Sequence, residues 1–284
     1  MAPKTKGHFL SGREIGRFRD RLREEEKSKN TLEKYLRDVT AFSEICPGEI
    51  TKETVIGYKQ RLIDGGYAVR SVNSVLASLN SLFSFLGWYE LRVKSLKVQK
   101  QVFRPEEKEL TKAEYERLCR TAEKKRNGRL CLILQTICGT GIRVSELRFV
   151  TVEAVRKGTA SVSLKGKTRS VFIVRDLQKK LLRYISERNL TSGAVFVTRT
   201  GRPIDRTNIW RKMKSLCAEA AVDPEKVFPH NLRHLFARVF YGIEKDIAKL
   251  ADLLGHSSID TTRIYIISTG TEHRQRMERM RLIL

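Results

Sequence analysis

Several features are missing from this chain of 284 residues, and each absence excludes a class of protein. No apolar run approaches the ~18 residues that a membrane-spanning helix needs, and residues 1–10 contain no apolar core of signal-peptide length. The five cysteines are scattered and form no C-x-x-C pair. This pattern argues against a disulfide framework and against a zinc site, and it is typical of a reducing compartment. We therefore expect a cytoplasmic protein without a membrane partner.

What the chain has in excess is positive charge. Its 56 lysines and arginines outnumber 32 aspartates and glutamates, which gives a formal net charge of +24. Residues 1–104 carry a net charge of +8 and the remainder +16, so both parts of the chain are basic. An excess of this size predicts a polyanionic partner, nucleic acid first, although basic residues also raise solubility without binding anything.

Residues 1–92 have the apolar spacing of a small helical bundle. Apolar residues recur at helical intervals in four stretches, about 11–26, 30–46, 51–64 and 71–86. Ser28 or Asn30 can cap the second helix, and Thr51 can cap the third. Short turns between helices of ~12–18 residues are typical of a bundle. A basic stretch, 93–109, follows as a linker.

Residues 110–284 combine helices with a few strands. The segments 160–164 and 170–174 flank the basic turn Lys165-Gly166-Lys167-Thr168-Arg169 and predict a β-hairpin, and a further short strand is expected at 194–197. Helices are expected from Thr111 and at about 129–138, 176–188, 206–220, 230–241, 243–254 and 261–267. The predicted fold class is mainly α with a small antiparallel β-sheet.

Two short patterns resemble known ligand sites, a nucleotide-binding loop and a zinc site, but in each case residues that such a site requires are missing. Gly139 and Gly141 lack the preceding strand and the third glycine of a nucleotide-binding loop. We interpret them as the end of one helix and the start of another that presents Arg143. His230 and His234 lack the intervening glutamate of a metalloprotease and a third ligand, so we predict no metal and no cofactor.

The remaining motifs form one ordered constellation. Gly141-Ile142-Arg143, Pro229-His230-Asn231-Leu232-Arg233 and Leu254-Gly255-His256 precede Tyr265, which follows His256 by nine residues. In chain order they give Arg…His-x-x-Arg…His…Tyr. A phenol with its unperturbed pKa near ~10 is a poor nucleophile at neutral pH. It becomes useful where cations stabilise charge on a phosphate and a base takes its proton.

This constellation resembles the tyrosine recombinase (phage integrase) superfamily, its small Xer-type members most of all, over nearly the whole chain. The resemblance implies an N-terminal SAM-like, core-binding domain and a catalytic domain at 110–284 that form a C-shaped clamp on double-stranded DNA. It implies site-specific recombination through a 3′-phosphotyrosyl intermediate and a Holliday junction, performed by a homo-tetramer on two DNA sites, in a nucleoid-associated protein that needs no cofactor.

The resemblance also implies six catalytic residues: Arg143, Lys165, His230, Arg233, His256 and Tyr265. The two arginines grip the scissile phosphate, His230 is the general base, and Tyr265 is the nucleophile. His256 stabilises the phosphoryl charge or positions the tyrosine. Glu146, one helical turn after Arg143, is expected to orient it, whereas His234 is left outside the site.

The general acid is expected in the hairpin turn. This turn is one residue shorter than the family pattern, so the choice between its two lysines is open. We choose Lys165, directly before the glycine, and keep Lys167 as the alternative.

Two other functions use the same features: strand cleavage and religation like that of a type IB topoisomerase, and DNA binding by a non-catalytic relative. The intact six-residue set argues against the second. The residues are compatible with chromosome-dimer resolution and with mobile-element transfer. They name neither the DNA target sequence nor a partner recombinase or activator.

The sequence after Tyr265 predicts a hinge at 266–270 and a helix at about 271–284. On this helix Met277, Met280 and Leu284 form one apolar stripe. Such a stripe needs a groove, either on its own catalytic domain or on a neighbouring protomer. The resemblance favours the neighbouring protomer and makes this segment an exchange helix.

Overall fold

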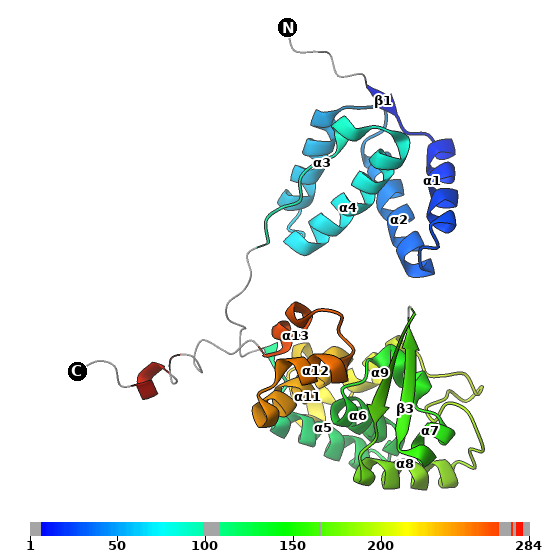
Figure 1. Cartoon of the computed structure of the whole chain (residues 1–284), viewed down its shortest axis with the longest axis vertical. Helices are drawn as coiled ribbons and strands as arrows, with labels where there is room; N and C mark the ends of the chain where they lie inside the picture. Colours follow the sequence, from blue (N-terminus) through cyan, green and yellow to red (C-terminus); the bar gives the residue numbers. More distant parts are fainter. Residues whose placement is uncertain (1–6, 99–107, 165, 267–273, 275–276, 281–284) are drawn as a thin grey trace. The chain divides into compact units, whose positions relative to one another are not determined.

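The chain forms two compact units, residues 1–100 and 101–284, each with a hydrophobic core of its own. The structure, a computed structural model, describes residues 7–98, 108–164, 166–266, 274 and 277–280 (Figure 1). The units are mostly helical with two small antiparallel sheets, which confirms the predicted fold class. No helix of these residues is long and apolar enough to cross a membrane.

Within residues 7–98, the first unit contains four α-helices, α1 (Gly12–Glu24), α2 (Lys29–Ile45), α3 (Lys52–Asp64) and α4 (Val69–Leu86). It also contains the strands β1 (His8–Phe9) and β2 (Glu49–Ile50) and the 3-10 helix η1 (Tyr89–Leu91). Hydroxyl side chains begin the first three helices, because Ser11, Ser28 and Thr51 each accept a backbone N–H there. Ser28, and not Asn30, is therefore the cap of α2.

The chain after α4 is bound to the first unit by two asparagines of α4. Asn80 donates to the carbonyl of Val93 (2.9 Å) and accepts from its N–H (3.0 Å). Asn73 pairs in the same way with Leu96, at 2.9 Å and 2.7 Å. Residues 93–96 fall within the predicted linker, yet they pack on α4, and Val93 is buried.

The second unit begins with α5 (Lys112–Lys124) and α6 (Gly128–Thr140), followed by η3 (Val144–Phe149), α7 (Val152–Lys157) and a β-hairpin. It continues through α8 (Arg175–Glu187), α9 (Arg206–Lys214), α10 (Cys217–Ala220), η4 (Pro224–Lys226), α11 (Pro229–Glu244), α12 (Ile247–Leu254) and α13 (Ile259–Ile266). Figure 1 shows α11, α12 and α13 gathered together in orange.

The hairpin is tighter than expected. Strands β3 (Thr159–Leu164) and β4 (Lys167–Phe172) pair as far as Leu164 opposite Lys167, so the turn has two residues instead of five. Gly166 supplies the positive φ, +73°, that such a turn requires. As a result Arg169 belongs to a strand and lies opposite Val162.

Other predicted elements change in their limits. The strand at 194–197 reduces to two isolated bridges, and the helix at 206–220 is divided into α9 and α10. The helix expected from 243 starts only at Ile247, because Lys245 takes a left-handed φ of +58° and Asp246 caps α12. Gly139 lies inside α6, and it is Gly141, at φ +64°, that ends this helix. The segment after Gly141 is the 3-10 helix η3, with Arg143 at its start.

We predict that Asn80→Ala releases the segment after α4. The loss of both amide bonds would leave the N–H and C=O of Val93 unpaired at a partly buried position, which typically costs about 1–3 kcal/mol. Hydrogen exchange followed by mass spectrometry should show faster exchange at Val93 and through α4. Asn30→Ala, the same substitution at an exposed position of α2, is the matched control. Unchanged protection of Val93 in Asn80→Ala would contradict the role of this asparagine.

Candidate active site

Helix α11 presents two of the candidate residues, together with His234, on one face. His230, Arg233 and His234 stand at i, i+3 and i+4, which are neighbours on a helix surface. Pro229 occupies the first turn, where its missing N–H has no partner to lose. Asn231 holds this end of the helix, because its amide donates to the carbonyls of Lys108 (3.0 Å) and Lys226 (2.8 Å).

Arg233 is almost completely buried, with 1% of its surface exposed. Its guanidinium donates through Nη1 to the carbonyl of Gly141 (2.6 Å) and through Nη2 to that of Leu254 (2.7 Å). Its Nε is buried and has no hydrogen-bond partner among the described residues. Burial, with the nearby charge of Arg143, lowers the pKa of Arg233 to about 10, so this side chain stays charged at neutral pH.

His256 lies directly after Gly255, the left-handed residue that ends α12. Its Nε2 is 2.9 Å from Arg233 Nη2, and its Nδ1 is 2.8 Å from the hydroxyl of the buried Thr262. Because a guanidinium only donates, Nε2 is the acceptor and Nδ1 carries the proton. Burial first, and then the charges of Arg233 and Arg143, lower the pKa of His256 to about 4. The neutral imidazole therefore accepts a hydrogen bond from Arg233 and does not itself place a second positive charge beside the guanidinium.

Tyr265, on α13, is buried against these residues. Its hydroxyl lies 3.2 Å from His230 Nε2, and its ring centroid is 6.0 Å from Arg233 Cζ. The ring of His234 stacks on the tyrosine ring at 4.2 Å with an interplanar angle of 27°. His234 was not expected in the site, and the structure places it in direct contact with the candidate nucleophile.

Arg143 is the most accessible of these arginines, with 37% of its side chain exposed. Its Nη1 is 2.9 Å from Glu146 Oε1, and its backbone N–H donates to Oε2 of the same carboxylate at 2.9 Å. The predicted contact between Glu146 and Arg143 is therefore present, although it forms in a 3-10 helix. Glu146 itself is 1% exposed.

In the described part of the chain, Tyr265 and four of the other five predicted site residues thus lie together, at α6–η3, α11, α12 and α13. The sixth, Lys165, lies outside the described residues. The alternative general acid, Lys167, is the first residue of β4. Arg169 and Thr262, both of which contact site residues, were not predicted from the sequence. The sequence did not indicate that Arg169 would reach the site, because the second strand of the hairpin was predicted to start at residue 170, which left Arg169 in the turn.

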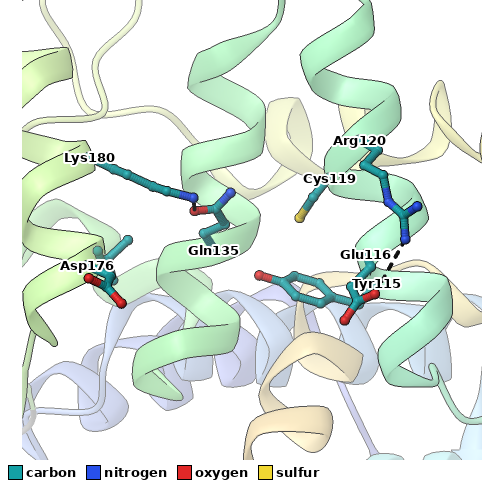
Figure 2. Close-up of a pocket in the computed structure, with 8 residues that line it drawn as sticks. Tyr115, Glu116, Cys119, Arg120, Gln135, Asp176 and Lys180 are labelled. Carbon is teal, nitrogen blue, oxygen red and sulfur yellow. Dashed lines mark hydrogen bonds and ion pairs between the residues drawn. The ribbon is translucent and has the colours of Figure 1, made fainter.

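The candidate site lies apart from a pocket in the second unit. This pocket, of about 600 Å³, lies among α5, α6 and α8, where Lys180 donates to Gln135 at 3.0 Å and Cys119 is one of the lining residues (Figure 2). None of the five described site residues lines it. Within the described residues no group of three or more histidine, cysteine or acidic side chains is arranged to hold a metal ion.

Comparison with known proteins agrees with this geometry over both units. Residues 108–272 match the phage integrase family, and residues 15–90 match its N-terminal SAM-like domain. Tyrosine recombinase XerA of Pyrococcus furiosus is 31% identical over 276 residues, which cover 94% of this chain and 93% of the relative. Tyrosine recombinase XerD of Xanthomonas campestris pv. campestris is 30% identical, with coverages of 89% and 87%.

Solved structures share the fold. The crystal structure of XerA recombinase is 25% identical and matches 96% of this chain and 99% of its own, with a TM-score of 0.54. A lambda integrase dimer bound to a COC′ core site is 18% identical and matches 90% and 95%, with a TM-score of 0.74. The chain therefore belongs to the phage integrase family, and it is a tyrosine recombinase, an enzyme that cleaves and rejoins DNA strands.

Proposed function

We propose that this chain recombines specific DNA sites and that Tyr265 is the residue that becomes joined to the DNA. The observation that carries the proposal is the cluster at Tyr265: its hydroxyl is 3.2 Å from His230 Nε2, and Arg233 lies beside its ring. The proposed partner is double-stranded DNA. Among proteins of the same fold, XerH was solved bound to its difH substrate and the Tn1549 transposon integrase in complex with transposon right end DNA.

In the proposed reaction the phenolic oxygen attacks the scissile phosphorus. His230 Nε2 accepts the phenolic proton, the O–P bond to Tyr265 forms, and the P–O5′ bond breaks. The leaving 5′ oxygen takes a proton from a lysine in the hairpin turn, Lys165 in our assignment. One phosphoester bond replaces another, so the step conserves bond energy, and religation is its reverse with the 5′ hydroxyl of the exchanged strand.

The arginines supply the binding site for the phosphate oxygens. Among the described residues nothing accepts a hydrogen bond from the buried Nε of Arg233, and leaving such a donor unpaired is costly. A non-bridging oxygen would satisfy it. Arg143 has one nitrogen on Glu146 and much of its side chain exposed, so its other N–H groups are available to the same phosphate.

We further propose that a tetramer acts on two DNA sites and that the first unit contacts the duplex as the core-binding domain. Five basic side chains of the first unit are candidate contacts to the DNA phosphates: Lys29, Lys34, Arg37, Lys59 and Arg70. Lys34 is committed to Asp38 (2.7 Å) and Ser78 (2.8 Å), and Lys59 donates to the carbonyl of Lys94 (2.9 Å). The exposed Arg37 and Arg70 are better candidates.

Tyr265→Phe should bind its DNA site with nearly unchanged affinity but form no covalent adduct, because only the hydroxyl is lost. Incubation with a nicked suicide substrate followed by denaturing electrophoresis measures the adduct. Tyr184→Phe is the control: it is the same change on α8, where the ring packs against Phe196 in a different part of the core, and it should form adduct at the wild-type level. An adduct with Tyr265→Phe would remove this tyrosine from the mechanism.

The two hairpin lysines can be separated by a substrate with a 5′-bridging phosphorothiolate, whose sulfur leaves without being protonated. Lys165→Ala should cleave the ordinary substrate slowly and the phosphorothiolate at close to the wild-type rate. Lys167→Ala should show no such selective rescue. Rescue of Lys167→Ala alone would reverse the assignment.

His256 should make the stability of the second unit depend on pH. Its pKa of about 4 lies below the value of 6.5 that it has when unperturbed. Between these values the unfolded chain binds more protons than the folded one, so His256 stabilises the fold above pH ~6.5 and loses this contribution as the pH falls towards 4. Thermal unfolding of wild type and His256→Gln at pH 7 and pH 4.5 should show a larger drop for wild type. Equal drops would show that His256 is not held in the neutral form.

The terminal segment after Gly270 is proposed to dock on a neighbouring protomer. Arg274 and residues 277–280 are helical, and Met277 and Met280 are 69% and 59% exposed. Of the hinge predicted at 266–270, Ile266 is the last residue of α13, and residues 267–270, like Leu284, lie outside the described residues. Deletion of residues 271–284 should leave binding to a single site intact and abolish cooperative assembly on two sites, as measured by gel-shift titration. Normal assembly by the truncated chain would contradict exchange.

A further inference from the structure

Arg169, on β4, reaches from the hairpin into the candidate active site. Its Nη2 lies 2.6 Å from Glu146 Oε2, and its Nη1 donates to the carbonyl of Leu253. The next residue in the chain, Leu254, is the one whose carbonyl accepts from Arg233. Only 13% of its side chain is exposed. Nothing in the proposed chemistry requires this third arginine, so its burial calls for a separate reason.

The carboxylate of Glu146 is shared between two arginines. Oε1 accepts from Arg143 Nη1 at 2.9 Å, and Oε2 accepts from Arg169 and from the backbone N–H of Arg143. An arginine and a carboxylate left to themselves favour a two-point grip in which both oxygens face one guanidinium. Because Arg169 occupies Oε2, Glu146 orients Arg143 through one side-chain bond and leaves its other N–H groups to a phosphate.

The Arg169 side chain packs against the backbone at Gly255, where a larger residue would not fit. A Cβ on Gly255 would lie 2.3 Å from Arg169 Cδ, and Gly255 has a left-handed φ of +65°. Only glycine meets both conditions at low cost. The Arg169 side chain therefore passes directly against the residue that separates Leu254 from His256, the two groups that hold Arg233.

We propose that Arg169 is a positioning residue for strand cleavage: it fixes Glu146 and, through Glu146, the orientation of Arg143. This inference rests on the proposed role of Arg143 at the scissile phosphate. It predicts an effect of Arg169 on the rate of cleavage and little effect on DNA binding, since the Arg169 guanidinium is largely buried and bonded to Glu146 and Leu253.

The test is a double-mutant cycle in single-turnover cleavage of a nicked suicide substrate. Arg169→Ala should slow cleavage by roughly 10²-fold, the loss that a misplacement of about 1 Å can cause, with an unchanged Kd. In an Arg143→Ala background the same substitution should add less than about 3-fold, because residues that act as a unit are not additive. Arg169→Lys keeps the positive charge at this position and serves as a second variant in case Arg169→Ala fails to fold. Its cleavage rate should lie between those of wild type and Arg169→Ala.

The phosphorothiolate substrate separates this role from a role in placing the hairpin lysine. Arg169→Ala should remain slow on it, by the same factor as on the ordinary substrate. Selective rescue, or additive losses in the cycle, would overturn the proposal. The matched control is Arg120→Ala, which breaks an exposed arginine–carboxylate pair with Glu116 (3.4 Å) on α5 (Figure 2) and should leave the rate unchanged.

The cycle also separates this proposal from the function on which it rests. Full cleavage by Arg143→Ala would remove Arg143 from the chemistry and with it the basis of the proposed site. Slow cleavage by Arg143→Ala together with wild-type cleavage by Arg169→Ala would leave the proposed function standing and refute the positioning role alone.

Discussion

The buried guanidinium of Arg233 constrains the geometry of the whole candidate active site. A charge removed from water is tolerated only where hydrogen bonds replace hydration. Here the replacement comes from the carbonyls of Gly141 and Leu254, at the C-terminal ends of α6 and α12. Carbonyls at such ends have no partner within the helix and carry the negative end of its dipole. Two helices must therefore end at the same point, and each does so at a glycine with a left-handed φ, Gly141 and Gly255.

The second constraint is the balance of charge around Tyr265. Three arginines, Arg143, Arg169 and Arg233, face one carboxylate, Glu146, and His256 is neutral. These three arginines and Glu146 together carry a net charge of about +2 in a partly desolvated position, where fixed charges act more strongly than in water. Such a site suits a phosphodiester that gains negative charge as it is attacked, because the arginines themselves supply the positive charge that stabilises it.

Much of this could be predicted from local sequence. Helix starts followed from hydroxyl caps such as Thr51 and Thr111, whose contacts are local and need no tertiary information. The spacing of His230 and Arg233 was enough to place both on one face of α11, because three residues make nearly one helical turn. The errors fall where local signals compete: Gly139 looked like a helix end, but a glycine inside a buried helix is tolerated when the packing of its neighbours outweighs the cost.

The sequence by itself determined the two basic, mainly helical parts, the family resemblance and the order of the site residues, because these depend on periodicity, composition and motif spacing. Tertiary structure alone decided how those residues touch. It gave His256 a neutral ring by burying it beside Arg233, stacked His234 on Tyr265, and brought Arg169 to Glu146. These contacts join residues that are far apart in the chain, and long-range packing, with the desolvation that accompanies it, sets their geometry and protonation; neither leaves a trace in local sequence pattern.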